Sequence, residues 1–212
     1  MNYAALVQAV QDYCENSESS FVANIPLFTQ LAEERIYSSV QIPALRKSQT
    51  GNMTSGNKYL TLPADWLATF SVAVIDPVTT AQTFLLNKDV NFIRGSYPNP
   101  TVIGTPAHYA QFDVNTLILG PTPDQNYGVE LHYYHYPQTI VTAGTTWLGD
   151  NFETVLLYGT LREAYLYMKG EEDMINYYEQ KYGESLALLK RLGDGLERRD
   201  AYRSGQVRSD VV

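Results

Sequence analysis

Three histidines have the widest chemical repertoire in this sequence. Two of them, His132 and His135, are separated by two residues within a run that predicts a β-strand. Because successive side chains of a strand point to opposite faces, this odd separation prevents the two imidazoles from binding one metal ion. Any of the histidines would need a partner serine and aspartate to build a nucleophilic triad, and no serine lies in a Gly-x-Ser-x-Gly elbow. The histidines therefore indicate neither a metal site nor a triad.

Neither the paired carboxylates nor the glycines of the sequence predict a catalytic or phosphate-binding site. Glu33 and Glu34 could supply acid–base chemistry, but two adjacent carboxylates on a predicted helix more often form a solvated face, which is what we expect here. Gly51 and Gly56 have the spacing of a phosphate-binding loop, yet Asn57 stands where that loop requires lysine. We therefore expect a protein that is not an enzyme and uses no cofactor or metal.

The composition predicts a folded, acidic protein. Of its 212 residues, 44% are hydrophobic and 18% are charged, which argues against wholesale disorder. The net charge of −8 makes attraction to free nucleic acid unfavourable, although an acidic channel would let DNA slide through without specific binding. The single cysteine, Cys14, can form no intramolecular disulfide. No run reaches the roughly 20 apolar residues of a membrane span, and no secretory signal is evident.

Apolar residues recur at helical spacing near both ends of the sequence. The periodicity predicts one helix over residues 3–13, and a second from a cap at Asn24 to a stop at Pro43. Asp150 is in position to cap a third helix that begins at residue 151 and ends at Gly170. A fourth, with near-heptad spacing, is predicted from residue 171 or 172 to about Gly193.

The middle of the chain has the pattern of strands and turns. Residues 59–62, 70–75 and 81–86 are predicted strands, and residues 88–97 a short helix or turn. Three aromatic and β-branched runs in residues 104–137, separated by turn residues, predict an antiparallel meander. The expected fold is α+β: a bundle of about four helices (residues 1–46 and 148–193), a central antiparallel β-rich insert (47–147) and an extended C-terminal arm (194–212).

Tyrosine is unusually abundant, with 17 residues against 7 Phe and 2 Trp. Its apolar ring and polar hydroxyl suit surfaces that become buried on assembly, although tyrosines at the rim of an ordinary core would also account for the number. We expect the following side chains to form a subunit or tail interface: Tyr133, Tyr134, Tyr136 and Trp147.

The last residues are polar, lack apolar periodicity and cannot bury enough surface to fold alone. Basic residues gather there but are interleaved with acids, so the excess is too small for phosphate binding. Arginine pairs well with carboxylates, which favours a protein partner over a frayed terminus. The candidate binding residues of this arm are Arg198, Arg199, Tyr202, Arg203, Arg208, Val211 and Val212.

An ordered set of short segments resembles the head-to-tail adaptor (neck, or head-completion connector) proteins of short-tailed and related tailed bacteriophages. The resemblance covers roughly residues 25–190. Its segments are 31–37 (LAEERIY), 62–67 (LPADWL), 104–106 (GTP), 109–110 (YA), 117–123 (LILGPTP), 130–134 (ELHYY), 147–148 (WL), 156–165 (LLYGTLREAY) and 177–178 (YY).

The resemblance implies a virion structural protein that is assembled in the bacterial host cytoplasm. It implies a homo-oligomeric ring, commonly of twelve subunits, that joins the portal protein to the tail around the DNA channel used for genome ejection. The C-terminal segment would reach the portal, and the β-rich part would receive a downstream nozzle or fibre protein. Two alternatives stay open, a carbohydrate- or receptor-binding β module of a phage tail and a cell-wall hydrolase that uses two carboxylates.

Overall fold

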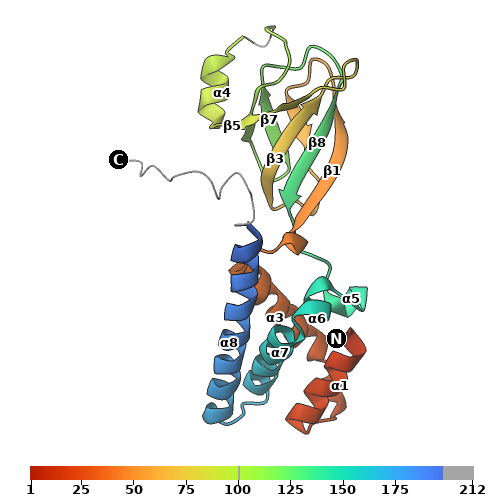
Figure 1. Ribbon diagram of the computed structural model, residues 1–212, viewed down its shortest axis with the longest axis vertical. Helices are drawn as coiled ribbons and strands as arrows, with labels where there is room; N and C mark the ends of the chain where they lie inside the picture. Colours follow the sequence, from red (N-terminus) through yellow and green to blue (C-terminus); the bar gives the residue numbers. More distant parts are fainter. Residues whose placement is uncertain (100, 198–212) are drawn as a thin grey trace, which may run out of the picture. The chain divides into compact units, whose positions relative to one another are not determined.

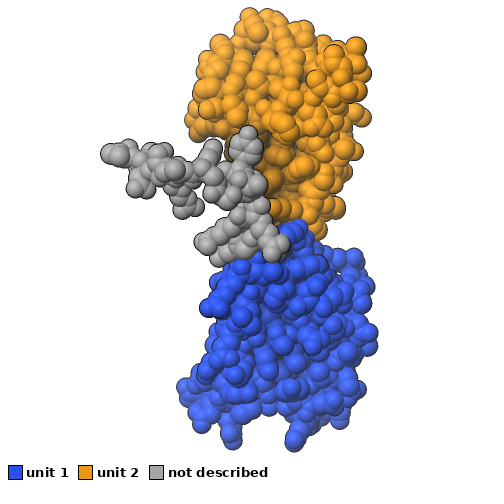
Figure 2. Space-filling view, viewed as in Figure 1, with its two compact units in different colours: residues 1–45, 137–212 blue, residues 46–136 orange. Residues whose placement is uncertain are grey.

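The computed structural model describes residues 1–99 and 101–197, and it divides the chain into two compact units (Figures 1 and 2). The helical unit contains residues 1–45 and the described residues from 137 onward, and the β unit contains residues 46–136. The chain thus leaves the helical unit once and returns to it. The α+β class with antiparallel sheets is confirmed. The insert was expected to extend to residue 147, whereas residues 137–147 lie in the helical unit.

Four helices of 12 residues or more form the body of the helical unit in the described part of the chain. They are α1 (Tyr3–Cys14), α3 (Ile25–Ser39), α7 (Glu153–Tyr167) and α8 (Glu172–Glu197). Three short helices and one 3-10 turn accompany them: α2 (Ser19–Val22), α5 (Ile140–Ala143), α6 (Trp147–Asn151) and η1 (Pro43–Leu45).

Helix α7 is at the centre of this unit, because α1, α3 and α8 all pack against it. Its Gly159 permits the close approach. A Cβ at this position would lie 3.1 Å from the Ala32 Cβ of α3 and 3.4 Å from the Tyr182 ring of α8. The buried apolar side chains of the four long helices include Leu6, Val10, Phe28, Ala32, Ile36, Val155, Leu156, Leu161, Ala164, Tyr178, Tyr182 and Leu189.

Two predicted helix boundaries were wrong. Asp150 does not cap α7, because it lies within the separate short helix α6, whose cap is Thr146. Helix α8 continues through Gly193 to Glu197, so residues 194–197 of the expected arm are helical. A Cβ at residue 193 would lie 2.5 Å from the Gln41 carbonyl oxygen. Gly193 therefore serves close packing rather than helix termination.

The β unit is a sandwich of two four-stranded sheets. One sheet has the order β1 (Arg46–Met53), β8 (Tyr127–Tyr134), β3 (Ala68–Ile75) and β4 (Gln82–Phe84). The other has the order β2 (Tyr59–Thr61), β7 (Thr116–Gly120), β6 (His108–Gln111) and β5 (Leu86–Asn87). Helix α4 (Val90–Ser96) packs on β6 and β7 of the second sheet (Figure 1).

The predicted meander over residues 104–137 was wrong in its last strand. Strands β6 and β7 do pair antiparallel, but β8 crosses to the other sheet and lies between β1 and β3. The connecting residues 121–126 include Pro121 and Pro123, which have no N–H for a continued ladder. The sheets are otherwise antiparallel except that β5 and β6 pair in parallel.

One core fills the space between the sheets. Along β8 alternate side chains are buried, as a strand with one face on a core requires. Strand β7 is buried on both faces, since Leu117 and Leu119 join the core between the sheets while Ile118 packs with Ile93 of α4. The main core contains Met53, Leu62, Trp66, Val72, Val74, Leu85, Tyr109, Leu117, Leu119, Tyr127, Val129, Leu131 and Tyr133.

We expect Gly159→Leu to lower the free energy of unfolding of the helical unit by about 1–3 kcal/mol, because the added side chain meets Ala32 and Tyr182 in a closely packed junction. The matched control is Gly183→Leu in α8, where a Cβ would have no atom within 4 Å and where leucine favours the helix. Thermal unfolding followed by circular dichroism measures both. Equal stabilities of the two variants would contradict the packing role of Gly159.

Candidate interaction surfaces

The structure separates the four residues predicted to form a subunit or tail interface. Tyr133, Tyr134 and Tyr136 belong to the β unit, whereas Trp147 belongs to the helical unit, where its ring centroid lies 5.7 Å from that of Phe152. Tyr136 and Trp147 are exposed and Tyr134 is half-buried. All seven predicted arm residues, from Arg198 to Val212, lie outside the described residues.

Tyr133 is a fully buried core residue and has no ring surface to offer a partner. Its hydroxyl donates a hydrogen bond of 2.9 Å to the Asp65 carboxylate, which also accepts one of 2.6 Å from the Lys47 ammonium. The Lys47 hydrogen bond lowers the pKa of Asp65, while burial raises the pKa of Tyr133. The three side chains join β1, β8 and the segment before β3.

Tyr134 faces the outer side of its sheet, together with an aromatic neighbour and a cation. Its ring packs edge-on against Phe70, with 5.9 Å between the centroids, and Phe70 stands at a β-bulge between Thr69 and Ser71. The Arg46 guanidinium lies 4.8 Å from the centroid of the Phe70 ring. We call Arg46, Phe70 and Tyr134 the Phe70 cluster. Because Phe70 is half exposed, this cluster can contact another protein.

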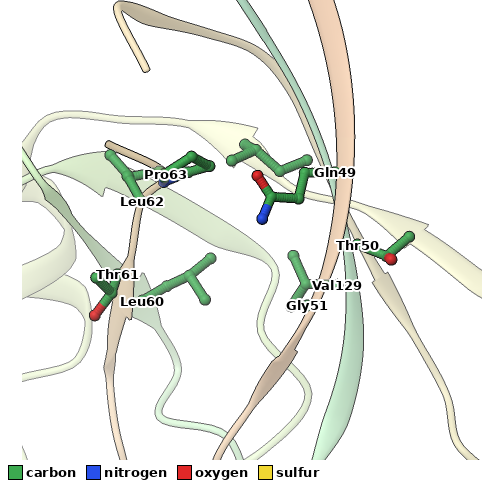
Figure 3. Close-up of a pocket in the computed structure, with 9 residues that line it drawn as sticks. Gln49, Thr50, Gly51, Leu60, Thr61, Leu62, Pro63 and Val129 are labelled. Atoms are coloured by element: carbon green, nitrogen blue, oxygen red, sulfur yellow. The ribbon is translucent and has the colours of Figure 1, made fainter. Parts of the chain in front are cut away.

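A groove of about 160 Å³ opens between β1 and β2, the edge strands of the two sheets (Figure 3). Leu60 and Gln49 approach each other across it from the two strands (Figure 3). Leu62, Val129 and Leu131 give it an apolar lining. Within the described residues each of these strands pairs on one side only. An edge of this kind presents unpaired backbone groups.

A second aromatic surface surrounds α4, and sequence reasoning missed it. Three exposed rings each have a cation within 6 Å of the centroid: Lys58 over Tyr59, Lys88 over Phe92 and Arg94 over Phe112. The first two pairs are close in sequence and could have been noticed. The third joins α4 to the end of β6 and depends on the tertiary fold.

The expectation of a solvated carboxylate pair on α3 was wrong for Glu33, although Glu34 is exposed. Glu33 is buried and accepts hydrogen bonds from the Thr139 hydroxyl (2.5 Å) and from the Ile140 backbone N–H (3.0 Å). Burial raises the pKa of Glu33, and the two hydrogen bonds oppose that shift. This carboxyl group therefore holds the start of α5 against α3.

The histidines have three different sets of neighbours. His132 Nε2 lies 3.4 Å from Glu130, His135 Nδ1 lies 3.9 Å from Asp65, and His108 Nδ1 is hydrogen-bonded to the Tyr97 hydroxyl at 2.9 Å. Residues 1–99 and 101–197 contain no group of three or more His, Cys, Asp or Glu side chains placed to hold a metal ion. In the same residues, no helix combines the length and the apolar character needed to cross a bilayer.

The two units therefore present exposed aromatic and apolar surfaces, whereas Glu33, Tyr133 and the three histidines each have a neighbouring polar group within the fold. These features are typical of a protein that acts by association. The family described as SU10 adaptor protein matches residues 1–210. The chain belongs to the SU10 adaptor protein family, which makes it an adaptor structural protein of a phage and a component of the virion. No curated protein is similar enough to count as a match.

We expect Glu33→Ala to lower the free energy of unfolding by about 1–3 kcal/mol, because the buried Ile140 N–H and Thr139 hydroxyl lose their acceptor. The pKa of Glu33 is raised in the folded state, so folded protein retains a proton that the unfolded chain has released. The contribution of Glu33 is thus complete below the ordinary glutamate pKa of about 4.3 and falls as the pH rises toward the folded pKa.

Urea unfolding of wild type, Glu33→Ala and the exposed control Glu34→Ala from about pH 4 to pH 7 measures this effect. The difference between wild type and Glu33→Ala should be largest at the acid end and should shrink as the pH rises. A difference that grows with pH would show that the hydrogen bonds, rather than burial, determine the pKa of Glu33.

Proposed function

We propose that this adaptor joins the portal to the tail as an oligomeric ring around the DNA channel, with its C-terminal arm docked on the portal. The match of residues 1–210 to the SU10 adaptor protein family is the observation that carries the proposal. The resemblance to short-tailed phage connectors supplies the expected number of twelve subunits. The ring is assembled in the host cytoplasm, and DNA passes through it during ejection without specific binding.

The distribution of charge supports both parts of this proposal. Residues 1–45 and 137–197 contain 15 acidic and 6 basic side chains, whereas residues 198–212 contain 2 acidic and 4 basic ones. An acidic ring wall repels DNA phosphates, so the genome does not adhere to it. A basic segment binds carboxylates, and arginine does so with two parallel hydrogen bonds. The arm is therefore suited to an acidic protein surface on the portal.

The β unit supplies the surface for the downstream nozzle or fibre protein in this proposal. The Phe70 cluster and the aromatic surface around α4 both expose rings beside cations. Aromatic and arginine side chains are enriched where proteins bind one another. Among the residues predicted from sequence, Tyr134 and Tyr136 lie on this unit, whereas the buried ring of Tyr133 is excluded from a direct contact.

The exposed rings around α4 also favour a second candidate, a carbohydrate- or receptor-binding module. Aromatic faces stack on sugars, and Tyr59, Phe92 and Phe112 present such faces. Binding on a glycan array that is lost in Phe92→Ser would support this candidate. Retention of portal and tail binding in the same variant would show that the two activities use different residues.

Truncation after Glu197 should abolish binding to the purified portal protein of the same phage and leave the circular dichroism spectrum close to that of wild type, because the removed residues lie beyond α8. Full-length protein in which Arg198, Arg199 and Arg203 are changed to serine is the matched control for charge. Electron microscopy of wild type with the portal should show a ring. Undiminished binding by the truncated chain would contradict docking through the arm.

A further inference from the structure

Two faces of the helical unit that are exposed in the described part of the chain are complementary to one another. We infer that α3 of one copy binds the outer flank of α8 of a second copy, and that this head-to-tail contact closes the ring. The inference rests on the proposed function, because it names the surfaces through which the adaptor self-associates. It concerns residues of the helical unit alone.

The first face is one side of α3, where Leu27, Leu31, Glu34 and Ser38 follow one another at steps of four, three and four residues. This spacing places them on one helix flank. Leu27 and Leu31 remain 50% and 42% exposed, although the opposite flank of α3 is buried. Two exposed leucines one turn apart form an apolar strip that nothing in the described part of the chain covers.

This strip borders a shallow groove of about 400 Å³ between α3 and α7, lined by Leu31, Glu34, Arg35, Ser38 and Glu163. Ion pairs connect the Arg35 guanidinium to Glu163 of α7 at 3.9 Å and to Glu179 of α8 at 3.6 Å. Arg35 is therefore already paired within the subunit. The Glu34 carboxylate has no ion pair or side-chain hydrogen bond within residues 1–99 and 101–197.

The second face is on α8, where Leu188, Arg191 and Leu192 occupy neighbouring positions on one flank. Leu188 is 59% exposed and Leu192 is 38% exposed. At about 100° per residue, this flank lies on the far side of α8 from Glu179, the residue that pairs with Arg35 of α3. The α8 face therefore points away from α3 of its own subunit, which leaves it available to a second copy.

The two faces match in chemistry and in spacing. Each presents two leucines four residues apart together with one charged side chain, Glu34 on α3 and Arg191 on α8. The Arg191 guanidinium, like the Glu34 carboxylate, has no ion pair in the described part of the chain. Contact would cover the leucines and pair the two charges. Because the two faces differ, the contact is heterologous, and heterologous contacts generate rings when the rotation closes.

Cysteine cross-linking tests the inference in full-length protein. The background is Cys14→Ser, since Cys14 is the only cysteine of the sequence. Copies with Leu31→Cys are mixed with copies with Leu188→Cys and oxidised, and a chain with both substitutions is oxidised alone. We expect a disulfide dimer from the mixture and a ladder of multimers from the double variant. Tyr177→Cys with Phe92→Cys, two exposed positions outside the paired faces, is the control and should give no ladder.

Charge reversal provides an independent measurement. Glu34→Arg or Arg191→Glu alone should weaken association by about two- to fivefold, as expected for an exposed ion pair, and the two reversals together should restore it. Sedimentation velocity over a concentration series supplies the association constants. Glu15→Arg, an exposed change near the end of α1, is the control for net charge.

The outcomes separate this inference from the proposed function. A ring seen by electron microscopy, without the expected disulfide ladder, would overturn the α3–α8 contact and leave the adaptor ring standing. Disulfide dimers formed by Leu31→Cys alone would also overturn it, because they would show a symmetric contact. Monomers with and without the portal protein, together with no cross-linking, would overturn both.

Discussion

The helical unit is built from two separate stretches of the chain, because the chain leaves this unit after residue 45 and returns at residue 137. The Glu33 carboxyl group makes a buried polar contact between the two stretches. This group lies on α3, before the excursion, and binds the Thr139 hydroxyl and the Ile140 N–H, immediately after it. A buried carboxyl group is costly unless it is hydrogen-bonded, so the arrangement is stable only when the returning chain occupies this position. Glu33 thus fixes where the second half of the helical unit begins, and α7 can then pack between α1, α3 and α8.

Sequence periodicity predicted the long helices and most strands, because those elements are specified by contacts between near neighbours. It placed α1, α3 and α4 close to their observed bounds and found β2 and the core of β3. It failed where distant segments decide the outcome. Gly193 was interpreted as a helix end, although its neighbour in space is the Gln41 carbonyl. Glu33 was assigned to a solvated face, because nothing in its local sequence indicates that residues 139–140 cover it.

The sequence predicted that the protein has aromatic interaction surfaces, but it predicted only some of the residues that form them. Tyrosine abundance indicated interfaces, and Tyr134 and Tyr136 do lie at the surface or near it. The side chains of Tyr133 and Tyr134 point to opposite faces of the sheet, as alternation along β8 requires. Alternation alone does not predict which face is buried, and in the structure it is the face that carries Tyr133. The Phe70 cluster and the pairing of Arg94 with Phe112 could not be found from sequence, because each joins strands or helices that are far apart along the chain.

The polar character of β1 has a consequence for how the β unit meets other copies of the protein. Seven of its eight residues, Arg46 to Asn52, are exposed, and they include Lys47, Gln49 and Gly51 but no aromatic or large apolar side chain. Long, apolar edge strands pair nonspecifically with the edge strands of other molecules, whereas lysine and other hydrophilic residues on an edge strand disfavour that aggregation. The exposed edge of β1 thus resists nonspecific sheet pairing, and specific association is left to the other exposed surfaces of the protein.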